Sequence, residues 1–164
     1  MKTITGIFLF VSLTLFFVFC KKTPEDTKAP VIHSELNDTF PHNCDTLWLG
    51  ETFAVKMKFS DDTELASFTI EIDHNFNMHT HPSLMSDCIN DTIKTPVYPF
   101  YYIKNFQIPE NLKEFTSNAI IWIPIEDCCG TPFDEGNYHF SVTLFDKEGL
   151  SVEKVQNVVI AKKL

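Results

Sequence analysis

Alternation of apolar and polar residues recurs along this chain and limits what it can fold into. In one segment Phe53, Val55, Met57 and Phe59 alternate with Thr52, Ala54, Lys56 and Lys58. The same period of two runs through residues 67–72 and 138–145, and no long stretch keeps a helical period. Successive side chains of a strand point to opposite faces, so each segment predicts a strand with one face in a core.

The spacing of these segments predicts a sandwich. We expect strands near residues 30–35, 51–59, 66–74, 97–106, 118–125, 137–145 and 151–160, separated by turn residues such as those at 61–62, 129–132 and 146–149. Short strands at regular intervals predict an all-β, antiparallel β-sandwich of about seven strands. Roughly 135 residues suit a single domain, which we place at residues 29–164.

Residues 134–140 carry a D-x-G-x-Y-x-F pattern. It resembles the tyrosine corner of immunoglobulin-like (Ig-like) domains, in which a tyrosine at the start of strand F bonds its hydroxyl back to the preceding turn. The resemblance implies that role for Tyr138. Phe140 stands where antibody domains have a cysteine, so their inter-sheet disulfide is expected to be absent.

Nearly the whole mature chain resembles a family of small, functionally uncharacterised bacterial Ig-like lipoproteins. The resemblance rests on the opening residues 29–32, the turn at 59–62, the closing residues 145–151 and a histidine-rich loop after strand C. In that loop the H-N-F-x-x-H-x-H pattern is matched by His74, Asn75, Phe76, His79 and His81. The resemblance implies a fold and a compartment and no established activity.

The N-terminus predicts export. Lys2 precedes an apolar run, Ile4 to Phe19, that is shorter than the roughly 20 residues needed to span a bilayer and is typical of a signal peptide at residues 1–19. Cys20 at its end resembles the lipidated cysteine of a bacterial lipoprotein, followed by a polar tether at residues 20–28. Phe19 departs from the small residue usual before that cysteine, so an uncleaved N-terminal anchor is the alternative. Either way we expect a lipid-anchored or membrane-anchored domain at the outer membrane or cell surface of a bacterium, with a periplasmic-facing position as the alternative.

The charge balance argues against nucleic acid as a partner. The formal net charge is −9, and all 13 basic residues are lysines. An acidic surface repels a polyanion, and without arginine there is no planar fork for phosphates.

Four cysteines follow Cys20, an even number that in an exported domain predicts disulfides among Cys44, Cys88, Cys128 and Cys129. A bridge between the adjacent Cys128 and Cys129 is strained, so we expect Cys44 and Cys88 each to pair with one member of this doublet. In a sandwich of this strand order the loops that hold these cysteines share the pole away from the tether.

The histidine-rich loop falls at the same pole and predicts a metal site. His79 and His81 project to one side if the chain is extended, and His74 at the end of its strand would supply a third nitrogen for Zn or Cu. His139, His42, Asp73 or Asp87 would complete the set, whereas Met78 or Met85 would favour copper. The competing interpretation is a polar loop with no ligand, in which His74 only caps the core.

Two further interpretations concern acidic turns and catalysis. Asp61, Asp62, Asp146 and Glu148 on tether-side turns could hold Ca2+, although solvated acids are commoner in turns. The sequence contains no nucleophile motif and no glycine-rich phosphate loop, so we expect no enzyme. The prediction is a lipid-anchored binding module with a metal ion or surface ligand as its partner. The alternative is a purely structural or adhesive surface domain.

Overall fold

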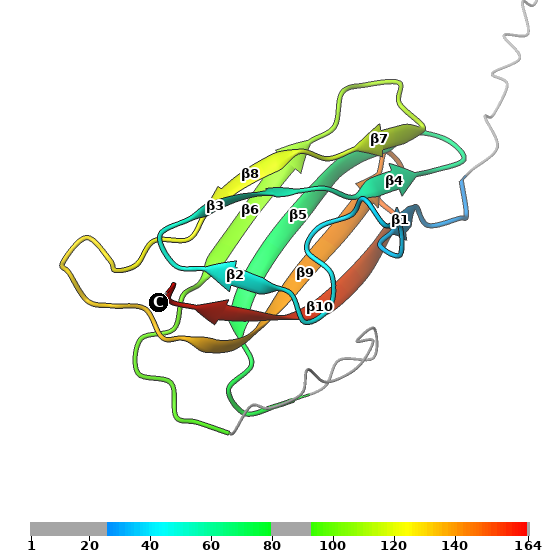
Figure 1. Cartoon of the computed structure of the whole chain (residues 1–164). Helices are drawn as coiled ribbons and strands as arrows, with labels where there is room; N and C mark the ends of the chain where they lie inside the picture. The colour runs from blue at the N-terminus through cyan, green and yellow to red at the C-terminus, as the bar shows by residue number, and fades with distance from the viewer. Residues whose placement is uncertain (1–25, 80–92, 164) are drawn as a thin grey trace, which may run out of the picture.

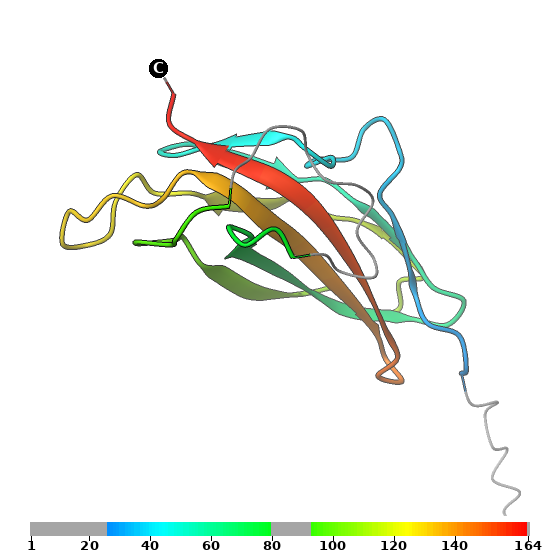
Figure 2. The same ribbon diagram turned by 90° about the horizontal axis from the view of Figure 1, so that it is seen from below.

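A computed structural model describes residues 26–79 and 93–163, which form two packed β layers (Figures 1 and 2). Across these ranges every regular element is a strand, and no helix is long and apolar enough to cross a membrane. The strands are β1 (Val31–His33), β2 (Thr46–Trp48), β3 (Thr52–Val55), β4 (Lys58–Ser60), β5 (Leu65–His74), β6 (Tyr102–Gln107), β7 (Glu114–Thr116), β8 (Ala119–Trp122), β9 (Gly136–Asp146) and β10 (Ser151–Ala161).

The larger layer is a five-stranded sheet in the order β2-β10-β9-β5-β6. Its three central strands are the longest of those in the described ranges, and their ladders are antiparallel. The short β2 runs parallel to β10 at one edge. In the register of β5 and β9, His74 lies opposite Tyr138 and Asp73 lies opposite His139.

The smaller layer consists of two ladders, β1-β4-β7 and β3-β8. β3 and β4 are successive parts of one path, interrupted at residues 56–57, and β7 and β8 are interrupted at 117–118. Ser117 joins the two ladders across this break, because its hydroxyl accepts a hydrogen bond from Met57 N (3.0 Å) and donates to Val55 O (2.8 Å). The smaller layer therefore acts as one sheet with a bend in it.

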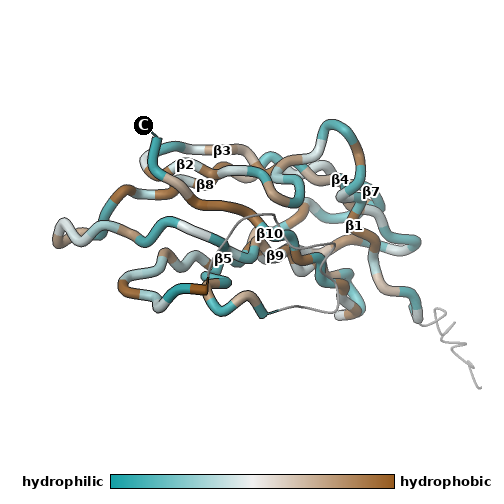
Figure 3. The backbone as a smooth tube through the Cα atoms, turned by 60° about the horizontal axis from the view of Figure 1, so that its bottom comes forward, coloured by the Kyte–Doolittle hydropathy of each residue, from teal (hydrophilic) through white to brown (hydrophobic). Residues whose placement is uncertain are grey.

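The core lies between the layers. Inward side chains of β9 are Tyr138, Phe140, Val142 and Leu144, all at most 1% exposed. Aromatic rings join the layers, as in the Phe59–Phe68 contact, whose ring centroids are 5.1 Å apart. Figure 3 shows that hydrophobic stretches lie mainly along the strands and hydrophilic ones mainly in the connecting loops. These contacts bury the apolar residues that alternate with polar residues in the sequence.

The predicted tyrosine corner is confirmed. Tyr138 is 0% exposed, and its hydroxyl donates to Asp134 O at 2.6 Å. The same oxygen accepts a hydrogen bond from Phe100 N at 3.1 Å. Burial raises the pKa of Tyr138 to about 12. Phe140, two residues further along β9, packs edge-on against Phe53.

The all-β sandwich predicted from the sequence is confirmed, with ten strands in the described residues where the alternation indicates about seven. The alternation does not indicate β2 and β7, each three residues long, and the strand predicted at 51–59 is divided into β3 and β4. The chain enters at the end that carries the β4–β5 and β9–β10 turns, and the C-terminus and the 126–135 loop lie at the other end (Figure 1). The predicted division of the loops between two poles is confirmed at the entry end, where Lys28 bonds Asp62 and Thr63 bonds Asp26.

Candidate functional site

A histidine pair lies on the outer face of the five-stranded sheet. His139 alternates with the core residues of β9 and so points outward, yet it is 0% exposed. His79, from the segment after β5, covers it, with the two ring centroids 4.7 Å apart and the planes nearly perpendicular. Asp73 on β5 lies beside it, with its Oδ2 3.8 Å from His139 Nδ1. The sheet register therefore brings together two imidazoles and a carboxylate.

Local contacts orient the two rings in the same way. His79 Nδ1 lies 2.7 Å from Asn77 Oδ1, an acceptor, so this nitrogen carries the proton and Nε2 carries the lone pair. His139 Nδ1 faces the Asp73 carboxylate, which favours the same tautomer. A carboxylate or carbonyl behind Nδ1 is the arrangement that prepares Nε2 of a histidine for a metal.

The neighbouring residues close the outer face around His139. On β10, Asn157 lies opposite His139 and is 3% exposed. Asn157 N donates to Asn43 Oδ1 at 2.9 Å, and Cys44 N donates to Asn157 O at 2.6 Å. On the other side the Met78 sulfur lies 3.4 Å from Asn137 Nδ2. His139 is thus enclosed by two chain segments that carry polar side chains, whereas His79 remains exposed.

Other predicted ligands lie elsewhere. His74 faces the core with Tyr138, and its ring packs against Phe76 with the centroids 4.9 Å apart. Its Nδ1 is buried and has no hydrogen-bond partner among the described residues. His42 contacts Asp45 and Thr39 in its own loop. The remaining predicted residues lie outside the described residues: His81, Met85, Asp87, Cys88 and the lipidation site Cys20.

The expected pairing of the cysteine doublet is wrong. Cys128 and Cys129 are both free and exposed, with their sulfurs 3.7 Å apart. They lie in the loop beyond β8, whereas Cys44 lies over β10 beside Asn157. Cys44 forms a disulfide. Neither thiol of the doublet takes part in it.

Asp127 organises the doublet loop. Its Oδ1 accepts from Cys129 N and Thr131 N, both at 2.8 Å, and its Oδ2 accepts from the Tyr98 hydroxyl at 2.8 Å. The hydrogen bonds from Thr131, Tyr98 and Cys129 lower the pKa of Asp127. One oxygen of Asp127 and the two sulfurs lie within 4.8 Å of one another. These hydrogen bonds already engage both carboxylate oxygens of Asp127. The arrangement is therefore that of a hydrogen-bonded turn, and we do not assign a metal site to it.

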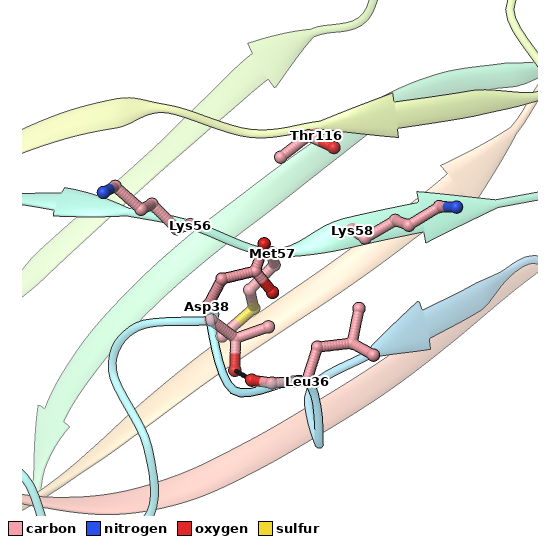
Figure 4. A pocket seen from close by; sticks show the side chains of 7 residues that line it. Leu36, Asp38, Lys56, Met57, Lys58 and Thr116 are labelled. Atoms are coloured by element: carbon pink, nitrogen blue, oxygen red, sulfur yellow. Dashed lines mark hydrogen bonds between the residues drawn. The ribbon is translucent and has the colours of Figure 1, made fainter.

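Two hollows lie on the smaller layer. One, of about 180 Å³, lies beside Met57, and its two lysines, Lys56 and Lys58, extend away from each other (Figure 4). It therefore offers no convergent set of polar groups. The other lies beside the doublet loop and is lined by Gly50, Trp122, Pro124, Ile125, Glu126 and Asp127. Trp122 is 59% exposed there, which makes this hollow apolar and accessible.

Comparison with known proteins gives a family and no activity. No curated protein matches this chain. Among solved structures, the crystal structure of Spo0M, a sporulation control protein from Bacillus subtilis, is similar with 10% sequence identity and a TM-score of 0.38. That match covers 84% of this chain and 51% of the Spo0M chain, so the chain spans about half the length of that relative. The family model described as "Domain of unknown function (DUF4625)" matches residues 18–161, and the chain therefore belongs to this family.

Proposed function

We propose that this protein is an extracytoplasmic, lipid-anchored binding module of the Ig-like type that holds Zn2+ or Cu2+ at the histidine pair. The observation that carries the proposal is the contact of His79 with His139, 4.7 Å between ring centroids, above the Asp73 carboxylate. Two imidazoles from distant parts of the chain meet here with their Nδ1 atoms turned toward oxygen acceptors. This is the tautomer that a histidine needs to coordinate through Nε2.

The ligand set differs from the one that the sequence alone suggests. His139 replaces His74, because residues 138 and 139 of β9 point to opposite faces of the sheet and His74 shares the face of Tyr138. Asp73 takes the role of a group that orients His139 and does not coordinate. Met78 lies close by and would favour copper.

His81 is the proposed third ligand. Within residues 26–79 and 93–163, His79 and His139 do not form part of a group of three close ligand atoms. A zinc site needs three or four ligands, so the set requires a donor from elsewhere. His81 follows His79 by two residues and lies outside the described residues, and its place in the set rests on the sequence pattern.

The compartment and the absence of catalysis are parts of the same proposal. Cys20 at the end of an apolar run supports lipid anchoring. A binding role is preferred to catalysis because the sequence carries no nucleophile motif and no phosphate loop.

Calorimetric titration of Zn2+ and Cu2+ into the metal-stripped, full-length protein tests the proposal. His79 is exposed, so His79→Ala removes a ligand without disturbing the core, and we expect it to weaken binding at least about 100-fold. Asp73→Asn, which removes the charge behind His139, should weaken binding about 10-fold to 100-fold.

The matched control is His33→Ala. His33 lies on β1 and contacts Ser60, in the smaller layer. It should bind metal as the wild type does. Equal affinity in the wild type and in His79→Ala, or no binding by the wild type, would reject the metal proposal.

The second candidate function is adhesion, and the apolar hollow around Trp122 favours it. Ile120 and Trp122 point outward from β8 and are each 59% exposed, and Ile125 is 46% exposed. Exposed apolar groups in one place mark interaction surfaces. Under this alternative, Trp122→Ser would reduce retention of the purified protein on bacterial cells, and His79→Ala would not.

A further inference from the structure

A group of carboxylates lies at the end of the fold where the chain enters. Asp26, Asp61 and Asp146 each place one carboxylate oxygen so that the three oxygens lie within 4.8 Å of one another. Asp26 belongs to the segment before β1, Asp61 to the β4–β5 turn and Asp146 to the end of β9. Figure 1 shows these three segments meeting at one end of the sandwich. The group is therefore assembled by the fold from three distant parts of the chain.

Two of these carboxylates have a buried oxygen that no described group satisfies. Asp146 is 2% exposed, and although its Oδ1 accepts from Leu150 N at 2.8 Å, its Oδ2 has no hydrogen-bond partner. Asp61 repeats the arrangement, because its Oδ1 accepts from Thr63 N and its Oδ2 is buried without a partner. Burial of an ionised oxygen without a partner is costly. Both turns therefore hold one oxygen in place and leave the other available to a cation.

Three carboxylate oxygens surround the hydroxyl of Thr63. Its hydroxyl lies 2.7 Å from Asp26 Oδ2, 2.8 Å from Asp61 Oδ1 and 3.2 Å from Glu148 Oε2. A hydroxyl has a single hydrogen and can satisfy only one of these three carboxylates fully at a time. Glu148 thus belongs to the same group, and the negative charges exceed the donors that face them.

The nearby lysines are engaged elsewhere. Lys28 Nζ bonds Asp62 Oδ2 at 2.5 Å, and Lys147 Nζ lies 3.5 Å from Glu64 and 3.8 Å from Glu110. No ion pair among the residues that the structure describes includes Asp26, Asp61 or Asp146. The hydrogen bond to Asp62 raises the pKa of Lys28, and the negative charges of Asp26 and Asp61 raise it further. Among the described residues, Lys28 therefore acts on Asp26 and Asp61 only at longer range, and no cation pairs directly with the three carboxylates.

We propose that Asp26, Asp61 and Asp146, with Glu148 and the Thr63 hydroxyl beside them, form a Ca2+ site. Oxygen ligands drawn from several loops suit Ca2+, which accepts irregular coordination by six to eight oxygens. Mg2+ requires a near-ideal octahedron, and Zn2+ and Cu2+ prefer nitrogen or sulfur donors. The site lies at the opposite end of the fold from the 126–135 loop and is independent of the histidine pair.

The site has a mechanical consequence for the tether. Asp26 lies in the segment that leads into β1, whereas Asp61 and Asp146 belong to the folded domain. An ion shared by all three fixes the entering chain to two turns of the sandwich. Bound Ca2+ then restricts motion between the domain and the segment that precedes β1.

Thermal unfolding of the full-length, chelator-treated protein with added Ca2+ tests the site. A ligand that binds only the folded state raises its stability, so millimolar Ca2+ should raise the Tm by about 5 °C or more. Mg2+ at the same concentration should raise the Tm less. Ca2+ should also slow tryptic cleavage after Lys28, because the segment around Asp26 becomes fixed.

The variants Asp61→Asn and Asp146→Asn should lose the Ca2+ response while unfolding at the same or a higher temperature than the wild type without Ca2+, because each removes an unpaired buried charge. Asp26→Asn and Glu148→Gln change half-buried and exposed side chains, so they keep the test valid if a buried variant fails to fold. Glu153→Gln, an exposed acid on β10, is the matched control and should respond as the wild type does. A wild-type Tm that Ca2+ leaves unchanged, or a full response in Asp26→Asn and Glu148→Gln together, would overturn the proposal.

Discussion

The hydroxyl of Tyr138 donates a 2.6 Å hydrogen bond to the carbonyl oxygen of Asp134, four residues earlier in the chain. It also accepts a hydrogen bond from Phe100 N. One buried phenol therefore holds two segments: the turn before β9 and the segment before β6. The same turn leads directly to His139, so the corner helps to place the histidine pair on the sheet.

Tyr138→Phe should destabilise the protein by about 1–3 kcal/mol, because it leaves the buried groups of Asp134 and Phe100 without their shared partner. Chemical denaturation monitored by far-UV circular dichroism measures this change. Tyr101→Phe is the control, since the Tyr101 hydroxyl bonds Glu71 on the surface, and its effect should stay within about 0.5 kcal/mol. Equal effects of the two substitutions would show that the corner contributes no more than a surface contact.

The raised pKa of Tyr138 predicts a loss of stability at high pH. Burial favours the neutral phenol in the folded state, with a pKa of about 12 compared with about 10 when the chain is unfolded. The contribution is therefore complete below pH 10 and is lost as the pH rises from about 10 to 12. The difference in stability between the wild type and Tyr138→Phe should shrink across this window. A difference that stays constant from pH 8 to about 12 would contradict the assignment.

Gly136 and Gly149 share a backbone conformation that strains residues with a side chain, and they differ in the space around the Cβ position. Both have positive φ, +137° and +90°, but a Cβ at Gly136 would lie 2.9 Å from Lys94 Nζ and 3.2 Å from Phe76, whereas one at Gly149 would meet nothing within 4 Å. Gly149→Ala should cost about 1 kcal/mol through conformation alone, and Gly136→Ala about 2–3 kcal/mol. Equilibrium unfolding of both variants checks the order, and the reverse order would contradict the packing at Phe76.

The four cysteines that follow Cys20 should divide into one bridge and two free thiols. Cys44 is disulfide-bonded, and we predict that it pairs with Cys88, which closes a loop that contributes about 4 kcal/mol in the chain-entropy model. Of these four, alkylation of the unreduced, folded protein should label Cys128 and Cys129 only. Peptide mapping should find the Cys44 fragment linked to the Cys88 fragment. A link from Cys44 to the doublet would contradict this pairing.

Most strands could be predicted because apolar and polar residues alternate along them in the sequence. β5, β9 and β10 match their predicted segments closely, since long strands with one buried face leave a clear period of two. β2 and β7 are too short to show a period, and β4 continues β3 after a break that no turn residue marks. Pairing between strands, unlike the strands themselves, depends on the whole fold.

The candidate sites were predictable only in part for the same reason. The phase of His74 with Phe68, Ile70 and Ile72 already indicates the core face, which the structure confirms. That Asp73 lies beside His139 depends on the register between β5 and β9, which no local pattern fixes. Asp61 and Asp146 could be selected as turn acids, but Asp26 could not, because its contact with Thr63 depends on the path of the tether.

Metal analysis of the isolated protein tests the central claim most directly. The full-length protein and its His79→Ala and His33→Ala variants would be purified without chelators, dialysed, and measured by inductively coupled plasma mass spectrometry. The account predicts about one Zn or Cu per chain in the wild type and in His33→Ala, and a small fraction of that in His79→Ala. No stoichiometric metal in the wild type, or equal metal in the wild type and His79→Ala, would contradict it.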